Sequence, residues 1–190
     1  MKIQIVAPQP GWKDEFRQIA AQLRAALGEL ALRIDHIGST SVPDLPAKDR
    51  IDIQVTVARL EPAVQSAMNG AGFSRVHHIS CDHVPPGASA DPAQWEKWLY
   101  NEIPGQRPAN IHIRVYGRAN QRYPILFRDF LRSHPEAAQA YAQVKQALAR
   151  LHPDDSQAYY DVKDPVCDII MSGAEIWAKT SKWSPAASDA

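Results

Sequence analysis

The fold is decided by residues 34–57, which read Ile-Asp-His-Ile-Gly-Ser-Thr-Ser-Val-Pro-Asp-Leu-Pro-Ala-Lys-Asp-Arg-Ile-Asp-Ile-Gln-Val-Thr-Val. A first strand, expected over 32–37, stops at Gly38-Ser39, because glycine lets the backbone turn sharply and leaves room for a ligand. A stiff link with two prolines follows. The next strand, over 51–57, alternates strictly between apolar and polar residues. The pattern predicts strand, turn, loop and strand, with one polar face.

The polar face of the second strand is suited to phosphate and metal chemistry. It carries the carboxylate of Asp52 and the amide of Gln54, next to the turn. N–H groups and hydroxyls of such a turn can cradle a phosphate, and a carboxylate on the neighbouring strand can hold a Mg²⁺ that bridges phosphate oxygens. The predicted phosphate ligands are Gly38, Ser39, Thr40 and Ser41, and the predicted metal ligands are Asp52 and Gln54.

A third strand, over 111–116, has His112 and Arg114 on its polar side. If it lies beside residues 51–57 in register, these two side chains share a surface with Asp52. The guanidinium of Arg114 is suited to bidentate phosphate recognition. We therefore expect Arg114 to act with Asp52 in catalysis, and His112 and Lys48 to contribute to phosphate binding.

Several motifs together resemble the GrpB family of the DNA polymerase beta-like nucleotidyltransferase superfamily. They are His-Ile-Gly-Ser-Thr-Ser-Val-Pro at 36–43, Leu-Pro-Ala-Lys at 45–48 and Ile-Asp-Ile at 51–53, and three later stretches, 127–135, 141–145 and 160–163, agree. The resemblance implies a nucleotidyltransferase-like fold. It also implies a Mg²⁺-dependent transfer of a nucleotidyl group from a nucleoside triphosphate to a small acceptor. In that account the Gly38-Ser39 turn holds the β- and γ-phosphates, and Arg114 with Lys48 stabilises developing charge.

The sequence also departs from the superfamily's pattern. Two acids on one strand and a third on a later strand normally share the metals there. Here Gln54 takes the second position, and the later strand offers His112 and Arg114. Acids near turns, namely Asp35, Asp44 and Asp49, are alternative ligands, and a capping role fits each of them at least as well. A second hypothesis is therefore a non-catalytic module that binds a nucleotide or phosphometabolite through a degraded metal site.

The whole chain is expected to form an α/β domain over 1–179, with a flexible tail over 180–190. A small mixed, twisted sheet carries helices mainly on its apolar face. The predicted strands are 3–6, 32–37, 51–57, 73–79 and 111–116, and the predicted helices are 12–27, 62–68, 123–131, 133–151 and 164–177. Residues 80–109 are irregular, with a short aromatic helix expected near 95–100, and are typical of a lid or specificity element.

Composition limits the partners. Lys plus Arg equals Asp plus Glu at 21 each, so no global field favours a nucleic acid polymer or an anionic membrane. No apolar run approaches the roughly 18 residues of a membrane span, and the opening Met-Lys-Ile-Gln-Ile-Val does not resemble a signal peptide. We expect a cytoplasmic protein. The cluster His77, His78, Cys81, Asp82 and His83 matches no closed zinc pattern, and ordinary loop residues are the favoured interpretation.

Overall fold

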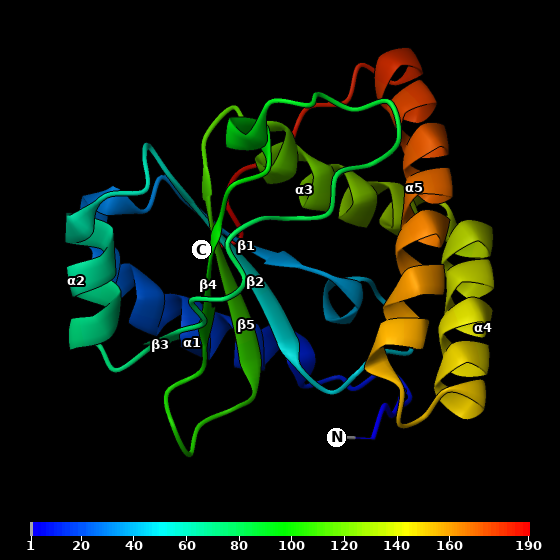
Figure 1. Cartoon of the computed structure of the whole chain (residues 1–190), viewed down its shortest axis with the longest axis horizontal. Helices are drawn as coiled ribbons and strands as arrows, with labels where there is room; N and C mark the ends of the chain where they lie inside the picture. The colour runs from blue at the N-terminus through cyan, green and yellow to red at the C-terminus, as the bar shows by residue number, and fades with distance from the viewer. Residues whose placement is uncertain (1) are drawn as a thin grey trace.

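A computed structural model describes residues 2–190, and it contains one mixed sheet flanked by helices (Figure 1). The strands are β1 (Arg33–Ile37), β2 (Ile51–Val57), β3 (Ser74–Arg75), β4 (Trp98–Asn101) and β5 (Ala109–Val115), in the order β1-β2-β5-β4-β3. β2 and β5 run parallel, and the other neighbours are antiparallel. The α/β class predicted from the sequence, with a small mixed sheet and packed helices, is confirmed.

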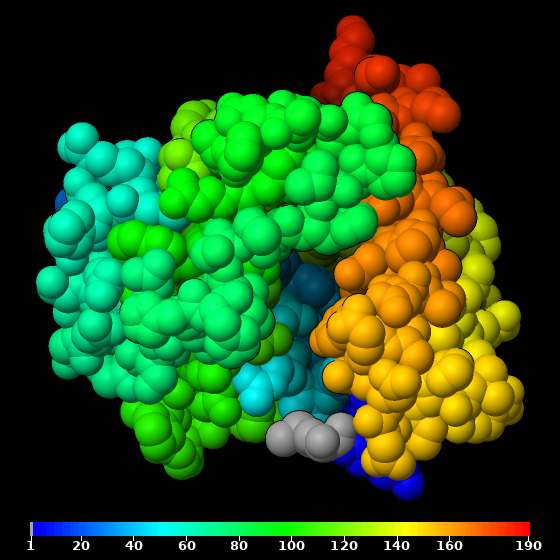
Figure 2. All heavy atoms as spheres, viewed as in Figure 1, coloured from blue at the N-terminus to red at the C-terminus, as the bar shows by residue number. Residues whose placement is uncertain are grey.

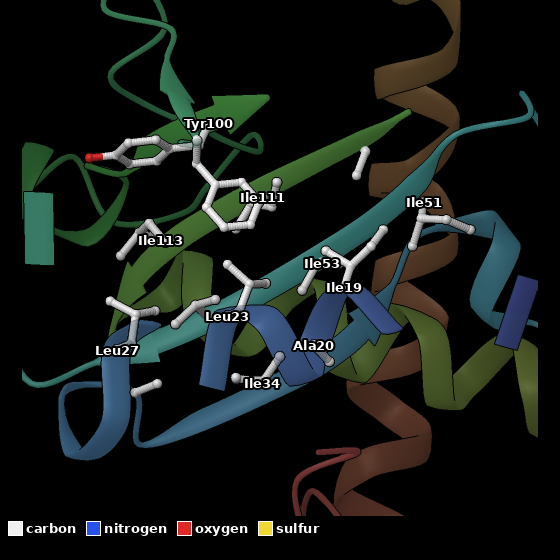
Figure 3. Packing of buried hydrophobic residues seen from close by; sticks show 14 of the residues in the cluster. Ile19, Ala20, Leu23, Leu27, Ile34, Ile51, Ile53, Tyr100, Ile111 and Ile113 are labelled. Carbon is white, nitrogen blue, oxygen red and sulfur yellow. The ribbon is translucent and has the colours of Figure 1, made fainter. Parts of the chain in front are cut away.

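The apolar face of the sheet is covered by α1 (Trp12–Leu27) and α2 (Pro62–Gly70). The predicted stripe of α1 is buried, and Figure 3 shows Ile19, Leu23 and Leu27 lying against isoleucines of the strands. Strict alternation in β2 places Ile53 at 0% exposure within this core. Burial of such side chains stabilises the fold by roughly 1.5–3 kcal/mol each. This core fixes which face of β2 carries the polar residues.

The polar face is covered by the C-terminal half of the chain. This half contains α3 (Ala119–Ser133), α4 (Pro135–Leu151) and α5 (Ser156–Thr180). Gln54 Nε2 of β2 donates to Gln121 O of α3 at 2.9 Å, so α3 lies directly on that face. The helices are thus divided between both faces of the sheet, more evenly than expected.

Three predicted elements near the sheet are wrong in detail. Residues 3–6 form one isolated bridge, Val6 with Ala47, and the strand predicted over 73–79 shrinks to the two residues of β3. The aromatic helix predicted near 95–100 is instead β4. β4 pairs with β5, and Tyr100 of this strand, at 0% exposure, packs into the apolar core.

Three predicted helix starts also differ. α3 begins at Ala119, four residues before the predicted start at Tyr123, and α4 begins at Pro135. The last helix begins at Ser156, where Asp155 Oδ1 accepts from Ala158 N–H as the N-cap, and so Pro165 lies inside α5. Because Pro165 has no N–H, the carbonyl of Asp161, four residues earlier, has no helical partner. Both residues are exposed, so water can hydrogen-bond to this carbonyl. The capping box expected at Ser133 is absent, because the Ser133 hydroxyl donates to Asp129 O instead.

Residues 181–190 follow α5 and return to the sheet. The Trp183 indole N–H donates to Asp129 Oδ2 at 3.1 Å, and Ala190 N–H donates to Ile34 O of β1 at 3.2 Å. A flexible tail was expected here, whereas the structure places this segment against α3 and β1. Over residues 2–190, no helix combines the length and the apolar composition that a membrane crossing requires.

Candidate functional site

A cleft of about 540 Å³ opens between the polar face of the sheet, the loop over 76–97 and helices α3–α5. Figure 2 shows the hollow between the green loop and the orange α5, with blue and cyan atoms from the first third of the chain at its floor. Several predicted site residues from separate elements meet here, namely Gly38, Ser39, Thr40, Lys48, Asp52, His112 and Arg114.

The turn after β1 is built around Gly38. Its φ is +69° and its ψ is −174°, a region that L residues with a side chain rarely adopt. A Cβ at this position would lie 2.4 Å from Asp52 Oδ2, so the carboxylate packs directly on the glycine Cα. A short 3₁₀ helix over Ser39–Ser41 follows. Ser41 N–H donates to Gly38 O at 3.2 Å, so the N–H groups of Ser39 and Thr40, which precede this first bond of the helix, are the ones that can face an anion. Glycine therefore brings the turn and the carboxylate into contact.

Asp52 lies at the floor of the cleft and remains partly exposed. Asn110 Nδ2 of β5 donates to Asp52 Oδ1 at 2.8 Å, as the parallel register of β2 and β5 allows. Burial raises the pKa of Asp52, and the Asn110 hydrogen bond and the charges of Lys163 and Arg50 oppose this rise. Oδ2 is thus the carboxylate oxygen directed toward the turn.

Lys145 of α4 reaches the turn from the opposite wall. Its Nζ donates to Ser39 Oγ at 2.7 Å and to Pro46 O at 2.6 Å, and the side chain is almost fully buried. Burial, together with the positive charge of Lys163, lowers the pKa of Lys145 to about 7. A cation that titrates near neutrality thus lies beside the hydroxyl of the predicted phosphate turn.

Arg114 is held by protein groups on the cleft wall. Asp82 of the 76–97 loop accepts from Arg114 Nε and Nη2, both at 2.9 Å, and from Lys97 Nζ at 2.6 Å. The cations Arg114 and Lys97 outweigh burial and hold the pKa of Asp82 well below its usual range. His112 Nδ1 lies 3.3 Å from Arg114 Nη2, and burial lowers the pKa of His112, which keeps it neutral. Arg114 thus belongs to an ion-pair network with Asp82 and Lys97, in which its Nε and Nη2 groups already have partners within the protein.

Gln54 completes that network. Its Oε1 accepts from Arg114 Nη1 at 2.8 Å, its Nε2 donates to α3, and the side chain has 0% exposure. In this arrangement the Gln54 oxygen is already engaged, although the sequence suggested it as a metal ligand. Within residues 2–190, no group of three His, Cys, Asp or Glu side chains is arranged to hold a metal. The donor set does not fit two metals. It fits one Mg²⁺, because this ion binds through one or two carboxylates together with substrate phosphates.

Two of the three acids suggested as alternative ligands have other partners, and the third lies elsewhere. Asp35 is fully buried and forms an ion pair with Arg33, while Asp49 accepts from Trp12 Nε1 and pairs with Arg107. Asp44 lies on a separate hollow beside α1. These contacts leave Asp52 as the carboxylate that adjoins the glycine turn.

Tyrosines and lysines line the mouth of the cleft. Lys48 Nζ lies 4.3 Å from the centroid of the Tyr159 ring and 3.2 Å from Tyr160 Oη, both on α5. Lys163, one turn further along α5, also lines the cleft. Ser41 lies on the other side of the turn, where its hydroxyl donates to Gly38 O at 2.6 Å. Ser41 thus stabilises the turn on the side that faces away from the cleft.

Sequence reasoning missed Asp82, Asn110 and Lys145 as parts of this site. Lys145 occurs in the stretch 141–145 that supports the family resemblance, and this motif is the feature of the sequence from which its role in the site could be predicted. Asp82 was assigned to an ordinary loop, because its partner Arg114 is 32 residues away in the sequence.

Comparisons with known proteins support the fold. A crystal structure of the conserved protein GrpB from Enterococcus faecalis is 28% identical, with a TM-score of 0.71, and the match covers 92% of this chain and 99% of that chain. The structure of Cid1 with its short product ApU matches at a TM-score of 0.50 and 14% identity, over 77% of this chain and 43% of Cid1. This second likeness shows a nucleotidyltransferase-like fold alone.

Curated relatives are similar over about 70% of this chain. A dephospho-CoA kinase of Mycobacterium tuberculosis (strain ATCC 25618 / H37Rv) is 40% identical in an alignment of 149 residues that covers 71% of this chain and 37% of the kinase. A UPF0157 protein of Deinococcus radiodurans is 33% identical in an alignment of 141 residues that covers 72% of this chain and 64% of that protein. The chain thus spans little more than a third of the mycobacterial proteins. The model of the family described as GrpB protein matches residues 2–172, and the chain belongs to this family.

Proposed function

We propose that the protein binds a nucleoside triphosphate in this cleft and transfers its nucleotidyl group to a small acceptor. The observation that carries the proposal is the meeting of three groups at one turn. Gly38 contacts the Asp52 carboxylate, and Lys145 lies on Ser39 Oγ. An anion-binding turn, a carboxylate for a cation and a fixed amine are the parts that a polyphosphate site needs. The family and the fold agree with this assignment.

In this proposal the chain's own residues bind and orient the triphosphate. Ser39 and the N–H groups of the turn bind phosphate oxygens, while Lys145 and Lys163 neutralise charge from the helical side. Asp52 Oδ2 would hold one Mg²⁺, which would supply further neutralisation of the phosphate oxygens. An acceptor oxygen forms a bond to the α-phosphorus, the bond to the bridging oxygen breaks, pyrophosphate leaves, and the acceptor's proton passes to solvent.

A second candidate function is binding without turnover, and the engagement of Gln54 favours it. Because the Gln54 oxygen accepts from Arg114, one carboxylate remains where the superfamily's pattern has several. Lys145 provides a positive charge beside the turn without any metal. A module of this kind would bind the triphosphate in the absence of Mg²⁺.

The mycobacterial relatives suggest one acceptor for testing. They are dephospho-CoA kinases, and this chain is similar to 37% of their length. Dephospho-CoA belongs in the acceptor panel with sugars, amino acids and polyols.

Calorimetric titration with ATP, GTP, CTP and UTP, each with and without Mg²⁺, tests both candidates when repeated on Asp52→Asn. The transferase predicts binding that needs Mg²⁺ and Asp52, followed by pyrophosphate release with an acceptor. The binding module predicts metal-independent binding that Asp52→Asn leaves unchanged or tightens, because the change removes a negative charge. No heat with any nucleotide would refute both.

A further inference from the structure

The outer side of edge strand β1 is covered by the final segment of the chain. β1 ends the sheet, so its outward backbone groups have no neighbouring strand. Ser188 Oγ accepts from Ile34 N–H at 2.8 Å and donates to Ile34 O at 2.9 Å. Asp189 Oδ2 accepts from His36 N–H at 2.9 Å. Side chains of the segment thus occupy hydrogen-bonding positions that a further strand would take.

The same carboxylate pairs with a buried arginine. Arg128 of α3 is 1% exposed, and its Nη1 donates to Asp189 Oδ2 at 2.7 Å and to His36 O at 3.0 Å. Asp189 and Arg128 therefore hold the N–H and the carbonyl of one residue, His36. Arg128 Nε also donates to Asp129 at 2.8 Å, so the guanidinium is charge-balanced in the docked state.

A second arginine of α3 holds the far end of the Gly38–Ser41 turn. Arg132, one helical turn after Arg128, donates from Nε and Nη2 to Ser41 O at 3.0 and 2.8 Å. His36 lies two residues before Gly38, and Ser41 ends the 3₁₀ helix. The two arginines therefore hold both ends of the turn, and Asp189 supplies one of the carboxylates that neutralise them.

We propose that residues 186–190 are a docked ligand of the β1 edge. The edge recognises an extended peptide in which a hydroxyl residue precedes an acid, and the occupant here is the chain's own Ser188-Asp189. Asp189 is a positioning residue, which fixes the start of the Gly38–Ser41 turn through His36 and Arg128. The docking stands on these contacts alone, and its effect on ligand binding rests on the proposed function.

Binding in trans tests the docking. The chain is truncated after Trp183, and a labelled peptide of residues 184–190, Ser-Pro-Ala-Ala-Ser-Asp-Ala, is titrated by fluorescence anisotropy. We expect saturable binding that weakens about tenfold or more in the Asp189→Ala peptide, because a charge-assisted hydrogen bond is worth roughly 1.5–3 kcal/mol. A Ser184→Ala peptide, which keeps the docking groups, serves as the matched control. Equal binding of all three peptides, or no binding, would overturn the proposal.

Amide hydrogen exchange on the full chain gives a second readout if the truncated chain fails to fold. Asp189→Ala should speed exchange at His36 about tenfold or more, because its N–H loses its acceptor. The exposed control Asp154→Ala should not. Unchanged exchange at His36 would overturn the docking. If Asp189→Ala also weakens nucleotide binding, the positioning role is supported, and unchanged affinity would overturn it. Failure of the wild-type chain to bind nucleotide would refute the proposed function, while the peptide and exchange results would still decide the docking.

Discussion

Replacing Gly38 by alanine tests the contact between the turn and Asp52. The backbone at φ +69° and ψ −174° costs an alanine about 1–3 kcal/mol. The new Cβ would also lie 2.4 Å from Asp52 Oδ2 and would force the carboxylate away from Asn110. Losing a hydrogen bond to a charged group adds about 1.5–3 kcal/mol. We therefore expect Gly38→Ala to lower the free energy of unfolding by about 2.5–6 kcal/mol.

The matched control is Gly28→Ala. Gly28 also has positive φ, at +50°, but a Cβ there would meet nothing within 4 Å. This variant should show only the backbone cost of about 1–3 kcal/mol. Urea unfolding followed by circular dichroism measures both, and calorimetry with ATP should show binding lost in Gly38→Ala and retained in Gly28→Ala. Equal stability losses, with binding intact in both variants, would refute the argument.

Three further predictions concern titrating groups. Burial lowers the pKa of Lys145 to about 7, and the protonated amine should favour triphosphate binding, so the affinity should fall as pH rises from 7 to 9. Calorimetry should show that this decline vanishes in Lys145→Met and persists in Lys13→Met. Asp82→Asn should lower the free energy of unfolding by about 3–5 kcal/mol at pH 7, because it leaves buried Arg114 and Lys97 without their carboxylate. Since the pKa of Asp82 is depressed, its contribution is complete above the usual carboxyl range and is lost as pH falls from that range through the lower pKa of the folded state, so the two proteins should converge only in strong acid. The exposed change Asp14→Asn should cost no more than about 1 kcal/mol. Burial lowers the pKa of His36 from 6.5 to about 3, so between these pH values the unfolded chain binds a proton at His36 that the folded chain does not, and the free energy of unfolding should decrease as pH decreases. His36→Gln should make this decrease smaller. An unchanged pH dependence in the variant would contradict a neutral buried His36.

Much of the fold could be read from the sequence because periodicity reports which face is buried. Alternation in β2 placed Asp52 opposite the isoleucines, and the stripe of α1 predicted its packing. The register of β2 with β5, in which Gln54 faces His112, is the one that the sequence required for a shared polar surface. These features depend on local pattern, and they were predicted correctly.

The rest of the site depends on contacts that local pattern does not encode. Lys145 meets Ser39 across 106 residues, so only the packing of α4 against the turn brings them together. The segment 98–101 is a strand because β5 offers it an edge, while its aromatic composition alone also suited a helix. The contact of Gln54 is also non-local, since its side-chain oxygen accepts from Arg114, which lies 60 residues away on the neighbouring strand.

The central claim is that a triphosphate occupies the cleft at the glycine turn. A crystal structure with a non-hydrolysable ATP analogue and Mg²⁺ tests it most directly. The account predicts that Ser39 and Lys145 would contact the phosphates and that the Asp52 carboxylate would hold the Mg²⁺. A triphosphate bound elsewhere, for example in the hollow beside Trp12 and Asp44, with the cleft empty, would contradict it.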